Sequence, residues 1–174
     1  MKEEPQEYLD LVDENDNVIG KAPRSEVRAR NLLHRGVGIL VFNSRGELYV
    51  HKRTETKDIF PGMYDMLVGG TVRAGESYEE AAAREAAEEL GIRGVPLRYL
   101  FSYLYEGPKN RCITKIFEVC YDGPMVHQPE EVAWGRFYPV SEVLNLMDRL
   151  PFVPDGSEIF REYLRRRLGE SERT

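Results

Sequence analysis

The chain has 174 residues, of which 41% are hydrophobic and 31% charged, enough to bury the core of one domain but not of two ordinary ones. Its 24 Lys and Arg residues are outnumbered by 30 Asp and Glu residues, and the net charge of −6 argues against a nucleic acid polymer as partner. The first ten residues are acidic and lack the apolar stretch of a signal peptide, and the longest apolar run, residues 37–42, is too short to span a bilayer. We therefore expect a cytoplasmic protein with no membrane partner.

Turn residues and apolar patterning divide the chain into short strands and a few helices. From the N-terminus they predict two strands joined by a turn (8–12 and 18–21), a short helix (23–30), two more strands (36–42 and 47–52) and a loop with a short strand (58–70). There follow a helix (78–90), two strands (96–105 and 111–121), a further strand (134–138) and two closing helices (140–146 and 157–168). This mixture of strands and helices indicates an α/β (α+β) sandwich. Cys112 and Cys120 lie on one expected strand, too far apart for a disulfide, which is consistent with a reducing compartment.

The helix at 78–90 has clear start and stop signals. Ser77 is a good N-cap, Glu80 three positions later completes a capping box, and Gly91 is a typical C-terminal stop. At about 100° per residue, a mostly alanine face would pack against the rest of the protein. We expect that face to contain Ala82, Ala83, Ala86, Ala87 and Leu90.

The same helix concentrates the negative charge of the chain. Residues 76–89 contain six Glu and one Arg, a local charge of −5. Glu85, Glu88 and Glu89 share the face opposite the alanines, where like charges repel and where the helix dipole disfavours anions. A hard divalent cation with oxygen ligands, Mg²⁺ or Mn²⁺, would compensate this arrangement.

The residues around this helix match a longer pattern, G-x5-E-x7-R-E-U-x-E-E-x-G-U, where U is apolar. Its specified positions are filled by Gly70, Glu76, Arg84, Glu85, Ala86, Glu88, Glu89, Gly91 and Ile92. The pattern resembles the Nudix box, the signature of the Nudix superfamily. The resemblance implies a Nudix-type α/β/α sandwich with a mixed sheet, here with an N-terminal β-hairpin extension.

The resemblance also implies roles for individual residues. Glu85 and Glu89 would be the principal metal ligands, Glu88 a further ligand or the base that activates water, and Gly70 a ligand through its backbone carbonyl. Arg84 would pair with Glu76 and hold the loop against the helix. The implied reaction is metal-dependent hydrolysis of a diphosphate linkage in a nucleoside diphosphate derivative or a related small pyrophosphate.

Residues outside the box are weaker candidates. In related proteins an acid near Glu131 can reach the metal, so this residue is an auxiliary base or ligand, with an exposed loop position as the alternative. Arg53 and Arg35 belong to a basic group near the core hairpin and are candidate substrate-binding residues, because guanidinium groups suit diphosphate. We expect His51 and His127 to be surface residues.

Two other functions stay open. Segments before the box, including Leu33-His34-Arg35 and Pro61-Gly62-Met63-Tyr64, resemble a Nudix subgroup that contains type I isopentenyl diphosphate isomerase. That enzyme needs a Cys and a His in a Cys-Gly-His segment, but the matching positions here hold Val68 and Gly70. A non-catalytic nucleotide-sensing module is the second alternative, although a sensor would not need the acidic face.

We divide the chain into an N-terminal extension packed on the core (residues 1–32), a Nudix domain (33–168) and a short tail (169–174). The N-terminal hairpin is a candidate surface for a homodimer. No motif selects one diphosphate substrate over another.

Overall fold

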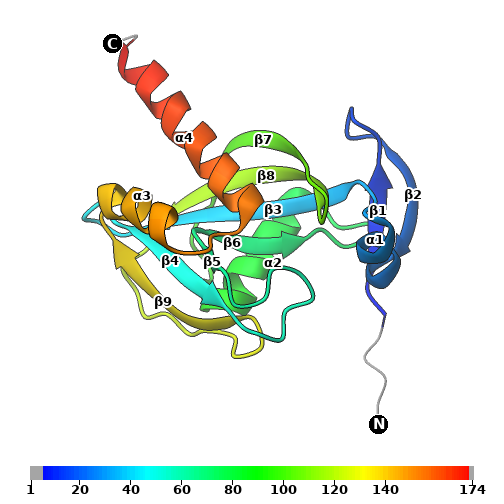
Figure 1. Cartoon of the computed structure of the whole chain (residues 1–174), viewed down its shortest axis with the longest axis horizontal. Helices are drawn as coiled ribbons and strands as arrows, with labels where there is room; N and C mark the ends of the chain where they lie inside the picture. Colours follow the sequence, from blue (N-terminus) through cyan, green and yellow to red (C-terminus); the bar gives the residue numbers. More distant parts are fainter. Residues whose placement is uncertain (1–5, 173–174) are drawn as a thin grey trace.

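The computed structural model describes residues 6–172, which form one mixed sheet with helices on both faces (Figure 1). The strands of this sheet are β1 (Tyr8–Val12), β2 (Val18–Pro23), β3 (His34–Phe42), β4 (Leu48–Arg53), β5 (Tyr64–Asp65), β6 (Leu67–Thr71), β7 (Arg98–Glu106), β8 (Arg111–Cys120) and β9 (Val132–Tyr138). The helices are α1 (Arg24–Arg30), α2 (Tyr78–Leu90), α3 (Val140–Arg149) and α4 (Pro154–Glu172). The predicted α+β architecture is confirmed.

Strand β3 organises the sheet. It runs parallel to β8 along its whole length and antiparallel to β6, and it also pairs with β1 and β4 at single positions. Its run of apolar residues fits a strand that is covered on both faces. Because side chains alternate along a strand, β3 supplies both cores of the molecule.

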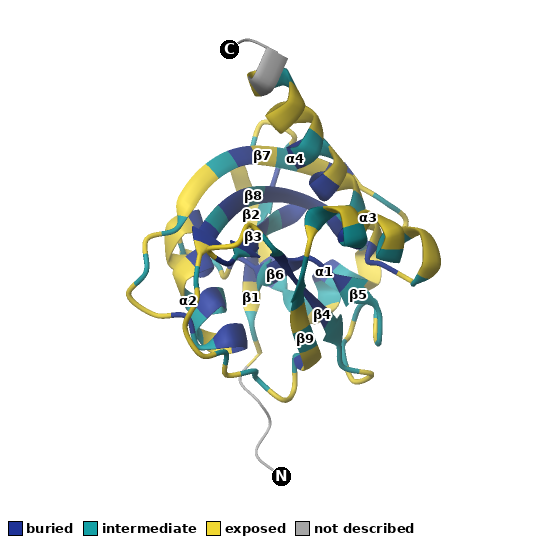
Figure 2. Cartoon of the chain, turned by 90° about the vertical axis from the view of Figure 1, so that its left-hand side faces the viewer, coloured by how far each residue is buried: buried dark blue, intermediate teal, exposed yellow. Residues whose placement is uncertain are grey.

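The two cores lie on opposite faces of the sheet. On one face, α2 packs against Val37, Ile39 and Val41 of β3. On the other face, Leu40 belongs to a cluster with residues of α3 and α4. Figure 2 shows the central strands buried between these layers, while the outer surfaces of the helices are exposed. The result is the expected α/β/α arrangement.

The N-terminal hairpin continues the sheet. Strand β1 pairs with β2 along the hairpin and contacts β3 through Leu11 and His34. Leu9, Ala22 and Val27 form a small core of their own beneath α1. This packing places α1 beside one end of the sheet, near β6 and the β7–β8 turn.

Several element boundaries differ from the prediction. The loop at 58–70 contains two strands, β5 and β6, and the last helix extends from Pro154 to Glu172, well beyond both of its predicted ends. Cys112 and Cys120 are both free thiols. Among the described residues, no helix is long and apolar enough to cross a membrane.

Candidate active site

Helix α2 is fixed by the local signals in its sequence. The Ser77 hydroxyl accepts a hydrogen bond from the backbone of Glu80 (3.1 Å), and the backbone of Ser77 donates to the Glu80 carboxylate (3.4 Å). The helix ends at Gly91 in the left-handed conformation. The predicted caps are therefore present at both ends.

The buried face of α2 differs from the predicted one. Ala83 is exposed, whereas the buried residues are Tyr78, Ala81, Ala82, Ala86, Glu89 and Leu90. The helix is turned so that Glu89, expected on the acidic outer face, is only 5% exposed. The small alanines allow this close approach to the sheet.

Two glycines of β6 make room for the buried carboxylates. The backbone N–H of Gly69 donates to Oε2 of Glu89 (3.2 Å). A Cβ atom at Gly70 would lie 2.8 Å from Oε1 of Glu85, so a larger residue there would push this carboxylate away. The double glycine thus sets Glu85 and Glu89 against the strand.

Arg84 links the loop before α2 to this pair. Its guanidinium donates two hydrogen bonds to Glu76, at 2.8 and 2.9 Å, and a third to the carbonyl of Thr71 at 3.1 Å. It also donates to Oε1 of Glu85 at 2.8 Å. Arg84 and Glu76 thus form the ion pair that the sequence pattern predicts, and the same guanidinium also binds Glu85.

The electrostatics of the carboxylate pair suit a cation. Burial raises the pKa of Glu85, and burial together with the charge of Glu85 raises the pKa of Glu89 to about 8. Both shifts would reverse with a positive ion between the groups. In the described part of the chain, no three acidic, His or Cys side chains converge on one point as metal ligands. Glu85 and Glu89 offer two carboxylates, and carboxylate oxygens are the kind of ligand that a hard divalent ion takes.

The other two acidic site residues predicted from the sequence, Glu88 and Glu131, each contact a basic side chain. The Glu88 side chain is 42% exposed, and its carboxylate lies 3.4 Å from the Arg84 guanidinium. Glu131, in the loop before β9, forms an ion pair with Lys57. Burial lowers the pKa of Lys57 to about 8, and the positive charge of Arg53 adds to this shift. Lys57 also acts electrostatically on Glu85 and Glu89, so it connects Glu131 with the carboxylate pair.

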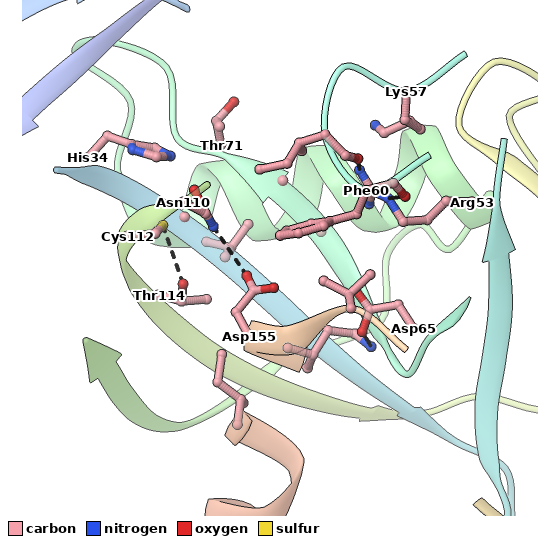
Figure 3. Close-up of a pocket in the computed structure, with 18 of the residues that line it drawn as sticks. His34, Arg53, Lys57, Phe60, Asp65, Thr71, Asn110, Cys112, Thr114 and Asp155 are labelled. Carbon is pink, nitrogen blue, oxygen red and sulfur yellow. Dashed lines mark hydrogen bonds between the residues drawn. The ribbon is translucent and has the colours of Figure 1, made fainter. Parts of the chain in front are cut away.

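A cavity of about 100 Å³ lies on the face of the sheet that α4 covers (Figure 3). Its described lining does not include Glu85 or Glu89, but it does include Gly69 and Gly70, the two glycines against which these carboxylates lie. Its floor is made of small residues on the central strands, including Gly36, Gly69 and Thr114. The loop before β5 and the start of α4 form its walls. Four cationic side chains reach it: Arg24, Arg28, Arg53 and Lys57.

The two predicted substrate-binding arginines have different surroundings. The Arg53 guanidinium lines the cavity, and it donates to the carbonyls of Ile59 (2.9 Å) and Phe60 (3.2 Å). Arg35 does not line the cavity. It forms an ion pair with Asp16 of the β1–β2 turn at 2.7 Å and lies over the ring of Tyr78. These contacts hold the hairpin against α2.

The prediction that His51 and His127 are surface residues is wrong for His51. This side chain is only 3% exposed, because it points into the cavity that the start of α4 helps to enclose. Burial lowers its pKa to about 3, so the ring is neutral. His127 is partly exposed and is hydrogen-bonded to the Tyr49 hydroxyl.

Sequence reasoning also missed two acidic residues of the cavity, Asp65 and Asp155. Burial, with the charge of Asp155, raises the pKa of Asp65 to about 7. Oδ1 of Asp155 and Nδ1 of His51 are buried without a hydrogen-bond partner among the described residues, which makes both available to a bound ligand. No spacing in the sequence links these residues, since they come from β4, β5 and α4.

Comparison with known proteins identifies the family. The model of the NUDIX domain matches residues 32–163. An uncharacterized Nudix hydrolase of Streptomyces coelicolor is 47% identical over 86% of this chain and 84% of its own length, and one of Pseudomonas aeruginosa is 42% identical over 91% and 94%. The crystal structure of the protein DR0079 from Deinococcus radiodurans is similar to this one with a TM-score of 0.79. The two sequences are 31% identical, and the match covers 90% of this chain and 98% of the DR0079 chain. The chain belongs to the Nudix hydrolases, a family of pyrophosphohydrolases that generally need a divalent metal ion.

Proposed function

We propose that this protein hydrolyses the diphosphate linkage of a nucleoside diphosphate derivative or a related small pyrophosphate, with Mg²⁺ or Mn²⁺. The observation that carries the proposal is the pair of Glu89, which is buried, and Glu85, whose side chain is 12% exposed, set against two glycines that also line a cavity with four cationic side chains. Buried carboxylates suit a divalent ion, and guanidinium and ammonium groups suit phosphate oxygens.

In this proposal the residues around the carboxylate pair have separate roles. Glu85 and Glu89 would hold the ion, with the Gly70 carbonyl and Glu88 as further ligands, and Arg84 would keep Glu85 in place. A bound divalent ion supplies charge neutralisation at the diphosphate oxygens. Arg53 would bind the diphosphate from the cavity side.

The base that takes a proton from the attacking water is Glu88 or Glu131 in this proposal. Glu88 is the more accessible carboxylate and lies on the same helix as the metal ligands. Glu131 is held by its ion pair with Lys57. Glu131 would act directly only if substrate binding separates this pair.

A panel of diphosphates tests the proposal. Release of phosphate or nucleotide with Mg²⁺ or Mn²⁺ should fall by roughly 10²- to 10⁴-fold in Glu88→Gln, the range typical of losing a catalytic acid or base. It should also fall in Glu89→Gln, which removes a proposed metal ligand. Glu79→Gln, on the exposed first turn of α2, is the matched control and should keep full activity. Undiminished turnover in both active-site variants would rule out the proposed roles.

The isomerase alternative lacks its proton donor. Val68, at the position of the isomerase Cys, is 1% exposed and packs in the core against α2. A valine can neither donate a proton nor bind metal, so we do not expect double-bond isomerisation of isopentenyl diphosphate. A nucleotide sensor would bind a diphosphate without cleaving it, and the same panel would reveal this as binding without product.

We also propose that the protein works in the reducing cytoplasm, which its two free thiols support.

A homodimer through the hairpin is a further proposal. Its edge strand β2 exposes Val18 and Ile19 to solvent, at 52% and 68%. A monomeric mass by light scattering would exclude it.

A further inference from the structure

Helix α1 brings two arginines of the N-terminal extension into the cavity of the catalytic domain. Arg24 and Arg28 lie one helical turn apart, and both line the cavity together with Gly70 and Thr71 of β6. Arg24 donates to Oγ1 of Thr71 at 3.3 Å. Arg28 donates to Oδ1 of Asn110, in the β7–β8 turn, at 3.0 Å. The extension therefore completes the wall of the cavity.

Two carboxylates, Asp58 and Glu7, are shared by three arginines: Arg24 and Arg28 of this wall and the exposed Arg73. Asp58 is shared by both arginines of the wall, at 3.0 Å from Arg24 and 3.4 Å from Arg28, and Glu7 adds a contact to Arg24. Burial lowers the pKa of Arg28, and the neighbouring charge of Arg24 adds to this effect. A guanidinium whose charged form is disfavoured by its surroundings is stabilised by an additional anion.

The opposite side of the cavity reinforces this charge. Arg53 and Lys57 line it, and both of them act electrostatically on Glu89. The cationic groups therefore extend from α1 to the edge of the carboxylate pair. The carboxyls that face them, Asp65 and Asp155, both have raised pKa values because of their burial.

The lining of the cavity does not suit a nucleobase or a sugar. Phe60 is the only Phe, Tyr or Trp among the described lining residues, and the volume of about 100 Å³ is small compared with the roughly 300–1,000 Å³ of ordinary ligand pockets. A compact, highly charged group with several acceptor oxygens fits better, because each arginine offers a planar set of donors.

We propose that this cavity binds the terminal phosphoryl group of a diphosphate monoester, with Arg24 and Arg28 as the residues that select it. The inference rests on the proposed function and narrows its substrate class. A diphosphate whose second phosphate is esterified to another moiety would have to place that moiety among the arginines. Water attacks one phosphorus, the P–O–P bond breaks, and the products are a phosphate monoester, inorganic phosphate and one proton.

Two diphosphates that share the same nucleoside provide the test. ADP has a free terminal phosphate, whereas in ADP-ribose the same position is esterified. We expect kcat/KM for ADP to exceed that for ADP-ribose at least about tenfold. Arg28→Gln should lower kcat/KM for ADP by roughly 10- to 100-fold, mainly through KM, as expected for losing hydrogen bonds to a charged group.

Arg30→Gln is the matched control, since Arg30 is on the same helix but 65% exposed and paired with Glu26. It should leave both substrates unchanged, and Arg28→Lys, which keeps the charge, should restore part of the loss. Isopentenyl diphosphate carries the same free terminal phosphate as ADP but has an alkyl group in place of the nucleoside. Comparing its kcat/KM with that of ADP therefore separates an alkyl from a nucleoside diphosphate as substrate. Faster hydrolysis of ADP-ribose than of ADP, or equal kcat/KM for ADP in Arg28→Gln and the unsubstituted protein, would overturn the inference.

A binding measurement separates this inference from the proposed function. Calorimetry with ADP and with inorganic phosphate should show binding that Arg28→Gln weakens and Arg30→Gln does not, even if no diphosphate is hydrolysed. Absence of hydrolysis with this binding intact would contradict the proposed function and support the cavity assignment. Hydrolysis of diphosphates together with phosphate binding insensitive to Arg28→Gln would contradict the cavity assignment alone.

Discussion

The burial of Glu89 predicts that the metal-free protein loses stability as the pH rises, and that Glu89→Gln reduces this loss. The pKa of this carboxyl is raised from 4.5 to about 8 by burial and by Glu85. Between these values the unfolded chain has released the proton while the folded chain retains it, so the free energy of unfolding decreases with pH. The decrease is about 1.4 kcal/mol per pH unit, which gives on the order of 3 kcal/mol at pH 7 and 5 kcal/mol at pH 8.

Urea unfolding in EDTA at several values between pH 5 and pH 8 measures this effect. Asp65 contributes a slope of the same sign, because its pKa is raised to about 7, so the quantity that isolates Glu89 is the difference between the unsubstituted protein and Glu89→Gln. We expect the variant to become progressively more stable relative to the unsubstituted protein as the pH rises, and saturating Mg²⁺ to stabilise only the latter. A difference that stays constant from pH 5 to pH 8, as we expect for Glu79→Gln, would refute the reasoning.

Two further substitutions test the surroundings of the pair. Gly70→Ala places a Cβ atom 2.8 Å from the Glu85 carboxylate, and we expect diphosphate turnover to fall at least about tenfold while circular dichroism shows an unchanged fold; full activity would show that Glu85 need not lie against β6. Arg84→Met removes the paired hydrogen bonds to Glu76, and urea unfolding should show a loss of about 2 kcal/mol, the range for hydrogen bonds between charged groups, whereas the exposed Arg93→Met should change stability little. Equal stability of these two variants would mean that the Glu76 pair contributes nothing to the fold.

The parts of the structure that depend on neighbouring residues in the chain could be predicted from the sequence. The ends of α2 are determined by Ser77, Glu80 and Gly91, all within or next to the helix, and they lie where the pattern places them. The Nudix box is likewise a local pattern, and both the family and the fold agree with it.

The parts that depend on contacts between distant segments could not be predicted. His51 looks like a surface residue in a short polar stretch, but it lines a cavity that α4, far later in the chain, helps to enclose. The guanidinium group of Arg35 is of a kind that often binds phosphate. In the structure it is paired instead with Asp16 of the preceding hairpin. No local pattern in the sequence marks Arg24 and Arg28 as site residues. They line the cavity only because the hairpin packs on β3 and so places α1 there.

We propose that Glu85 and Glu89 together bind the divalent ion used in diphosphate hydrolysis. Mn²⁺ binding followed by electron paramagnetic resonance measures this, with the double variant Glu85→Gln/Glu89→Gln compared with Glu79→Gln. We predict that the double variant binds Mn²⁺ at least about tenfold more weakly, since both oxygen donors lose their charge, and that Glu79→Gln binds it normally. Unchanged Mn²⁺ affinity in the double variant would contradict the claim.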